Sequence, residues 1–208
     1  MELKNLSITD FMAKTASMDP VPGGGSVSAL CGALAGALAE MVTGLTIGRK
    51  KYADAEEEMR QIAPRMAAAK DAFLDFIDKD AAAYDEVFAA FKMPKETDEE
   101  KAVRAEAIQK STLHAAMVPL EVAKRAVAIM DDIHAVALRG NQNAVTDSCV
   151  AMMCARTATF GAILNVMINL QGLNDQDTVA RLTDECARLR ATAADKEITL
   201  LNHVNLLP

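Results

Sequence analysis

The chain has 208 residues, of which 51% are hydrophobic and only 4% aromatic, and it carries a formal net charge of −7. This length suits one domain spanning residues 1–208, and the scarcity of aromatic and β-branched runs favours an all-α fold. The acidic balance argues against a general nucleic-acid binder, because contacts to phosphates need a basic face.

The first two predicted helices span residues 7–16 and 26–47, and a proline-containing break separates them. The second helix carries a single charge, Glu40, which also fits a membrane span. Its composition is mostly alanine and glycine, however, and is therefore weak in transfer energy. We expect no membrane association but a buried helix, in which Gly32 and Gly36 allow close approach of neighbours in a bundle centre or a subunit interface.

Four further helices follow from the spacing of apolar residues. Residues 53–91 form a long helix, in which Pro64 marks either a kink or a break. The capping-box spacing of Thr97 and Glu100 begins the next helix, which runs to residue 139 with a kink at Pro119. Residues 148–170 form a second nearly uncharged helix, and the last helix runs from residue 174 or 175 to residue 206. These elements predict a multihelical bundle with long antiparallel helices.

The glycine turn of Gly23, Gly24, Gly25 and Ser26 is the first candidate for a functional site. Glycine permits close approach of a ligand or a second backbone, and the turn leads into a helix N-terminus whose free N–H groups attract anions. The segment is not a P-loop, because the GK[ST] ending is missing. The alternative is a turn that only permits tight helix packing.

Asp80 lies on the apolar series of the long third helix, one turn before Tyr84. An ionised carboxylate buried without partners is costly, so such a group either finds a cation or shifts its pKa. The alternative is a position at the edge of the apolar series, where Asp80 is solvated or pairs with a lysine such as Lys79.

The stretch GNQNAVTD places a polar turn between two buried helices. Asn141 and Asn143 tolerate turn geometry, and residue 146 or 147 is expected to cap the following helix. On that helix Asn165 and Asn169 share one face, and buried amides need hydrogen-bond partners. These amides either grip a polar ligand or bridge to neighbouring backbone.

Other kinds of site have less support. The three histidines are isolated and no metal-site spacing occurs, so we assign no metal. The four cysteines form no CxxC pair and lie in apolar patterns, which is typical of free thiols in a reducing compartment. Because the first residues also show no secretory signal, we expect a cytoplasmic protein.

Several of these motifs occur together and in order: PVPGGGSVSALCGALAGALAEMVTGLTIGRKKY, KDAAAYDEV, AAMVPLEVAKRA, GNQNAVTD and NVMINL. In this combination the sequence resembles the cyclodeaminase/cyclohydrolase family. That family includes the C-terminal domain of the bifunctional formiminotransferase-cyclodeaminase and free-standing bacterial methenyltetrahydrofolate cyclohydrolases. The resemblance covers nearly the whole chain, and no formiminotransferase domain is present in it.

The resemblance implies an all-helical homodimer that binds a one-carbon derivative of tetrahydrofolate as its substrate. The binding groove would be lined by the glycine turn, the helix of Asp80 and Tyr84, and the Asn-rich turn. No cofactor beyond the tetrahydrofolate-bound substrate is implied. Both reactions of the family pass through a tetrahedral carbon flanked by nitrogens, and they need proton transfer and stabilisation of a cation, tasks that suit a secluded carboxylate.

The resemblance also assigns roles to residues. Asp80 is the first choice as general acid/base and cation stabiliser, Asp147 is the second, and Tyr84 orients Asp80. The residues assigned to substrate binding are Gly23, Gly24, Gly25, Ser26, Arg49, Lys50, Lys51, Asn141, Asn143, Asn165 and Asn169. Among them the amides would read the pterin edge and the three basic residues would hold the glutamate tail.

The absence of a formiminotransferase partner in this chain favours methenyltetrahydrofolate cyclohydrolase activity, which converts 5,10-methenyltetrahydrofolate and water to 10-formyltetrahydrofolate. The alternative is formiminotetrahydrofolate cyclodeaminase activity, which releases ammonia to give 5,10-methenyltetrahydrofolate. A third possibility of a different class is a catalytically silent helical dimer that serves as a binding or scaffold module.

Overall fold

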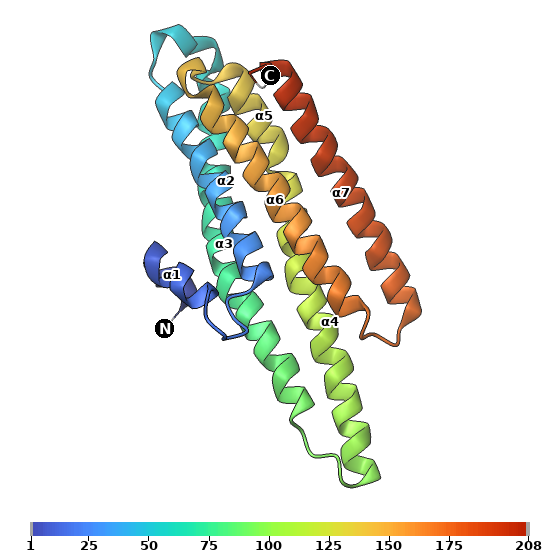
Figure 1. Ribbon diagram of the computed structural model, residues 1–208. Coiled ribbons are helices and arrows are strands. Elements are labelled where there is room, and N and C mark those ends of the chain that lie inside the picture. Colours follow the sequence, from blue (N-terminus) through green and yellow to red (C-terminus); the bar gives the residue numbers. More distant parts are fainter. Residues whose placement is uncertain (1, 207–208) are drawn as a thin grey trace.

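The computed structural model describes residues 2–206 as a bundle of long helices (Figure 1). The α-helices of this part are α1 (Ile8–Thr15), α2 (Gly24–Thr46), α3 (Glu56–Phe91), α4 (Asp98–Ala128), α5 (Met130–Arg139), α6 (Val145–Leu170) and α7 (Gln176–Val204). Three short 3₁₀ helices, η1 (Leu3–Asn5), η2 (Lys50–Ala55) and η3 (Gln142–Ala144), lie between or before them. The predicted all-α bundle with long antiparallel helices is confirmed.

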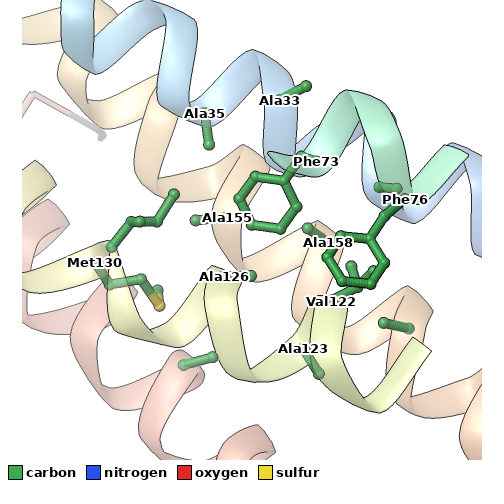
Figure 2. Close-up of a cluster of buried hydrophobic side chains, with 14 of the residues drawn as sticks. Ala33, Ala35, Phe73, Phe76, Val122, Ala123, Ala126, Met130, Ala155 and Ala158 are labelled. Carbon is green, nitrogen blue, oxygen red and sulfur yellow. The ribbon is translucent and has the colours of Figure 1, made fainter. Parts of the chain in front are cut away.

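Helix α2 is the buried core helix that its composition predicts, and it packs along α3 and α6. Its small residues leave room for the larger side chains of α3: Phe73 lies fully buried, with Ala155 and Ala158 beside its ring (Figure 2). A Cβ on Gly32 would lie 2.6 Å from the Phe73 ring, so only glycine fits at this contact. The glycine and alanine residues of α2 therefore allow close helix packing, and the first glycines of this helix also form part of the site described below.

Three helix starts follow the capping signals in the sequence. Ser7 accepts a hydrogen bond from the backbone of α1, and Asp175 does the same for α7. Thr97 and Glu100 form a complete capping box at the start of α4. Each cap satisfies N–H groups that the first turn of a helix leaves without partners.

Other predicted boundaries are wrong. The helix expected over residues 97–139 is divided into α4 and α5 at Ile129, whereas Pro119 lies buried inside α4 without ending it. Proline removes one N–H donor from a helix, and burial against the core offsets that loss here. Pro64 likewise lies inside α3.

Two helices also begin elsewhere than predicted. Helix α2 starts at Gly24, so Gly24 and Gly25 belong to its first turn and Gly23 is its N-cap. Helix α6 starts at Val145 with Ala144 as N-cap, and residues 146–147 lie inside its first turn instead of capping it. The turn before α6 is closed by η3, whose N-cap is the Asn141 side chain.

An exposed apolar stripe follows the outer faces of α2 and α6. We call it the α2–α6 stripe, and its residues are Leu34, Met41, Leu45, Val150, Leu164 and Ile168, with exposed fractions of 38% to 71%. By length and composition, α2 and the segment Gln142–Leu170 are apolar enough to cross a membrane. About half of each apolar window (50% and 44%) is already buried inside the bundle, which is typical of core helices with one face left over.

Candidate active site

Helices α3 and α4 extend past the ends of α2 and α6 and form a hairpin arm (Figure 1). A cleft lies beside the base of this arm. The cleft is lined by Pro20, Val21, Gly23, Gly24, Gly25, Asp80, Ala83, Tyr84, Val87, Ala115, Asn165, Ile168 and Asn169. Its volume is about 380 Å³, which lies within the size range of small-molecule sites. Three of the sequence-predicted groups therefore meet in one place: the glycine turn, the helix of Asp80 and Tyr84, and the paired amides of α6.

Asp80 lies against the first turn of α2. The Ser26 hydroxyl donates a hydrogen bond to Asp80 Oδ2 at 2.9 Å, and the backbone N–H of Ser26 also donates to this carboxyl group. The approach requires glycine at position 25, because a Cβ there would lie 2.5 Å from Asp80 Cγ. Lys79, the alternative partner, instead lies over the ring of Phe76. Asp80 is thus held by a helix N-terminus and not by a lysine.

The surroundings of Asp80 change its acidity. Burial raises the pKa of the Asp80 carboxyl group, and the two hydrogen bonds from Ser26 lower this pKa by less than burial raises it. A raised pKa brings a carboxyl group closer to the pH at which it can both accept and return a proton. Perturbed carboxyl groups in clefts are typical of catalytic sites.

The two amides of α6, Asn165 and Asn169, line the cleft. Asn165 Nδ2 donates to the Gly161 carbonyl at 2.8 Å, and Asn169 Nδ2 donates to the carbonyls of Asn165 and Ala115 at 2.8 and 3.1 Å. These bonds fix both side chains and identify the nitrogen of each amide. Within residues 2–206 neither side-chain oxygen accepts a hydrogen bond, so both are available for the N–H groups of a ligand.

Tyr84 lines the cleft. Its ring stacks on Phe88, one turn further along the arm, with centroids 6.3 Å apart. The hydrogen bonds that Asp80 accepts come from Ser26, and the orienting role of Tyr84 stays a prediction. Tyr84 is placed to contact a ligand, and Ser26 positions the carboxyl group.

The Asn-rich turn lies at the opposite end of the bundle. Asn141 receives a hydrogen bond from the Tyr52 hydroxyl at 3.2 Å, and its backbone N–H donates to Thr46 Oγ1 at 2.8 Å. Its side-chain nitrogen donates to the Leu45 carbonyl at 3.2 Å. The hydrogen bonds of Asn141 therefore connect the turn before α6 to the end of α2.

The glycine turn and the Asn-rich turn do not line one groove within a single chain. Helix α2 has 23 residues and spans about 34 Å between the two ends of the bundle. Arg49, Lys50, Lys51 and Asn143 lie with the Asn-rich turn at the far end. Asp147 is 18 residues before Asn165 on α6, or about 27 Å along the helix. In an antiparallel bundle, motifs separated by one helix length lie at opposite ends.

Sequence reasoning missed several lining residues. Ala83 and Val87 lie three and seven residues after Asp80, so helical spacing places them on the same face. Ala115 and Ile168 come from α4 and α6, and no local pattern distinguishes them from core positions. Within residues 2–206, no group of three or more His, Cys, Asp or Glu side chains is arranged to hold a metal ion.

Comparison with known proteins places these features in a family. The model of the formiminotransferase-cyclodeaminase family matches residues 7–188. The chain belongs to this family. One relative is the methenyltetrahydrofolate cyclohydrolase of Methylorubrum extorquens, which is 37% identical over 189 residues that make up 91% of each chain.

Members of the family also occur as part of larger proteins. The formimidoyltransferase-cyclodeaminase of Sus scrofa is 32% identical over 194 residues, which are 93% of this chain but 36% of the pig protein. The crystal structure of formiminotetrahydrofolate cyclodeaminase from Thermotoga maritima aligns with a TM-score of 0.87 and 28% identity over 98% of both chains. The protein and the Thermotoga maritima cyclodeaminase therefore share one fold over nearly their whole lengths.

Proposed function

We propose that this protein hydrolyses 5,10-methenyltetrahydrofolate to 10-formyltetrahydrofolate, with Asp80 as the general acid/base. The observation that carries the proposal is the desolvated carboxyl group of Asp80 in a cleft of ligand size. The Methylorubrum extorquens relative, which is named for this reaction and matches over 91% of its own length, supports it.

The chemistry requires one group that accepts a proton and returns it. The reacting carbon of the substrate bridges N5 and N10 and shares their positive charge, which an ionised Asp80 attracts. As water attacks this carbon, Asp80 takes one of its protons while the C–O bond forms. Protonated Asp80 then gives that proton to N5 as the C–N5 bond breaks. The remaining hydroxyl proton passes to solvent, and a formyl group is left on N10.

The rest of the cleft suits a flat heterocycle with donor groups on one edge. The side-chain oxygens of Asn165 and Asn169 match the N–H groups of a tetrahydropterin ring. Val87, Ala83 and Ile168 provide apolar surface beside them. Such pairing of acceptors and donors lets the cleft discriminate between ligands, because a ligand without matching donors leaves buried polar groups without hydrogen-bond partners.

Formiminotetrahydrofolate cyclodeaminase activity is the second candidate. The Thermotoga maritima structure named for this activity supports it, since it matches the chain over 98% of its length. In that reaction the formimino group enters as its protonated amidinium, whose terminal nitrogen already carries two hydrogens. N10 attacks the amidinium carbon and Asp80 takes the N10 proton as the C–N10 bond forms. Protonated Asp80 then gives this proton to the terminal nitrogen as its C–N bond breaks, so that ammonia leaves and the positive charge stays on the methenyl carbon. Because both reactions use the same carbon and the same carboxyl group, the cleft serves either one.

A spectrophotometric assay distinguishes the candidates. The purified protein is mixed with 5,10-methenyltetrahydrofolate, whose near-ultraviolet absorbance falls on hydrolysis, or with formiminotetrahydrofolate, where this absorbance rises. We expect turnover of the first substrate. Turnover of only the second would establish the cyclodeaminase reaction, and a folded protein that converts neither would support a silent binding or scaffold module.

We also infer that the reaction needs no cofactor beyond the folate, because Asp80 and solvent supply every proton transfer. Dialysis against a metal chelator should leave the rate unchanged. A cytoplasmic location is supported by four free thiols, which are typical of a reducing compartment. Fractionation of the source cells would test it.

We infer further that the protein is a homodimer formed through the α2–α6 stripe. An exposed apolar surface of this length marks a protein interface, and a second copy buries it on both partners at once. Leu164→Asp, at the most exposed stripe position, should yield monomers in light scattering, whereas Ile8→Asp, at an exposed isoleucine on α1, should not. A dimer that survives Leu164→Asp unchanged would place the interface elsewhere.

A further inference from the structure

We propose that Ser26 is a positioning residue whose hydrogen bond reverses each time Asp80 changes its protonation state. The Ser26 hydroxyl donates to the ionised carboxylate. When the carboxyl group takes a proton, the hydroxyl turns to the Ile77 carbonyl and accepts from Asp80 instead, so that the acid keeps one position through the reaction. The inference rests on the proposed function, in which Asp80 takes a proton from water and returns it to N5.

The hydroxyl group of Ser26 has two acceptors for its single hydrogen. Its oxygen lies 2.9 Å from Asp80 Oδ2 and 3.2 Å from the Ile77 carbonyl oxygen. A serine hydroxyl donates one hydrogen bond and accepts through two lone pairs, so it does not serve both acceptors fully at the same moment. The contact to the carboxyl group is the shorter one, as expected while Asp80 is ionised.

Water does not replace a missing partner at this position. The Ser26 side chain is fully buried, with 0% of its surface exposed, and a buried polar group without a partner is costly. Ile77 is also buried and lies inside α3. Its carbonyl uses one lone pair for the helical hydrogen bond and has a second for Ser26. The protein itself therefore satisfies the hydroxyl in both protonation states of Asp80.

Other buried hydroxyl groups of the core helices are satisfied in a different way. Ser28, Thr46 and Thr159 each donate to the carbonyl four residues earlier in their own helix, at 2.6, 2.7 and 2.9 Å. Ser26 lies in the first turn of α2, and Pro22, four residues before it, lies outside the helix. The Ser26 hydroxyl bonds across to α3 instead, so its partner depends on the state of Asp80.

The reversal fits the proton transfers of the proposed reaction. Ionised Asp80 accepts from the hydroxyl and from the backbone N–H of Ser26. When water gives its proton to Asp80 Oδ2, the Ser26 hydrogen rotates to the Ile77 carbonyl, and Ser26 Oγ accepts from the new O–H group. When N5 takes that proton, the hydrogen rotates back. Ser26 gains and loses no proton, and the acid needs no reorientation during the reaction.

Infrared spectroscopy tests the change of partner without requiring turnover. The protein is labelled with isoleucine that carries carbon-13 at its carbonyl, and spectra are compared above and below the pH at which Asp80 titrates. Among the described lining residues of the cleft, Tyr84 is the only other ionisable group, and phenols titrate at about pH 10. Because a hydrogen bond weakens a carbonyl bond, the Ile77 band should move to lower wavenumber as Asp80 is protonated.

Three variants interpret these spectra. Ile77→Val keeps the backbone carbonyl but removes its label, so the difference from wild type isolates the Ile77 band. Ser26→Ala should abolish the shift because no hydroxyl is left to change partner, and Asp80→Asn should abolish it because residue 80 no longer titrates. An Ile77 band that stays fixed in the wild type would overturn the proposal. An equal shift in Ser26→Ala would do the same, because the change of charge alone would then explain it.

Steady-state kinetics test whether the reversal supports the reaction. If Ser26 only lowered the pKa of Asp80, Ser26→Ala would regain wild-type kcat at pH values above the acidic limb. We expect kcat on this plateau to stay roughly tenfold or more below wild type, with KM changed by less than about twofold, because the protonated acid has lost its acceptor. A plateau kcat equal to wild type would overturn the proposal.

The matched control is Ser28→Ala, which removes another buried hydroxyl from α2 and should keep both kinetic parameters. An equal loss of kcat in this control would show that any buried hydroxyl of α2 has the same effect, and would overturn the specific role of Ser26. If Ser26→Ala does not fold, the infrared shift of the wild type and its absence in Asp80→Asn decide the question.

Failures of the two proposals have different signatures. A wild-type protein that converts neither folate substrate refutes the proposed function, while its infrared spectra still report on the Ser26 hydroxyl. An active enzyme whose Ile77 band stays fixed when Asp80 is protonated refutes the role of Ser26 and leaves the function intact.

Discussion

Gly25→Ala probes how closely the position of Asp80 is set by the start of α2. A Cβ at residue 25 would lie 2.5 Å from Asp80 Cγ, whereas ordinary contacts of this kind begin at 3.4 Å. Asp80 Cγ would have to retreat by roughly 0.9 Å, the difference between these distances, and Asp80 Oδ1, which lies nearer to the added Cβ, by more. Because a misplacement of about 1 Å in an active site can cost about 10²-fold in rate, we expect kcat/KM to fall by about two orders of magnitude.

The matched control is Gly44→Ala in the same helix, where an added Cβ meets nothing within 4 Å. This variant should retain wild-type kcat/KM and gain about 0.5–1 kcal/mol in the free energy of unfolding, because alanine favours helix over glycine. Steady-state assays and thermal unfolding of both variants provide the measurements. The double variant Gly25→Ala/Asp80→Asn should be no slower than Asp80→Asn alone. A folded Gly25→Ala protein with wild-type kcat/KM would refute the reasoning.

Three more predictions follow from the same site. Ser26→Ala removes hydrogen bonding that lowers the pKa of Asp80, so the acidic limb of the kcat/KM–pH profile should move to higher pH; an unmoved limb would show that Ser26 does not tune this group. Because the folded protein holds the Asp80 proton more tightly than the unfolded chain, stability should fall as pH rises through the raised pKa. Asp80→Asn should therefore gain stability relative to wild type as pH increases above about 4 in urea titrations, and a constant difference would contradict this. Asn165→Ala should raise KM two- to tenfold, as expected for one ligand hydrogen bond, with a smaller change in kcat, and an unchanged KM would remove Asn165 from the binding edge.

The sequence predicts the helices well because each feature is local. Apolar spacing identifies α2 and α6, and the capping signals of Ser7 and Thr97 need only a few residues. The break at Ile129 carries no such signal, since it contains neither glycine nor proline and its neighbours favour helix. Pro119 lies inside α4, as the prediction of a helix running through this proline requires.

The site could be predicted in its chemistry but not in its geometry. A carboxylate on an apolar helix face identifies Asp80, and glycines before a helix indicate close approach. That the first turn of α2 approaches Asp80 depends on how α2 and α3 pack, which no spacing rule contains. The same limit explains why Asp147 and the Asn-rich turn were grouped with Asp80, because a resemblance relates motifs without saying which end of a bundle each occupies.

The most direct test of the account is the rate of 5,10-methenyltetrahydrofolate hydrolysis by wild-type protein and by Asp80→Asn, both confirmed as folded by circular dichroism. If Asp80 is the general acid/base, kcat should fall by about 10²- to 10⁴-fold while the helical content is kept. A folded Asp80→Asn protein whose kcat stays within a few-fold of wild type would contradict the central claim that this carboxyl group carries the reaction.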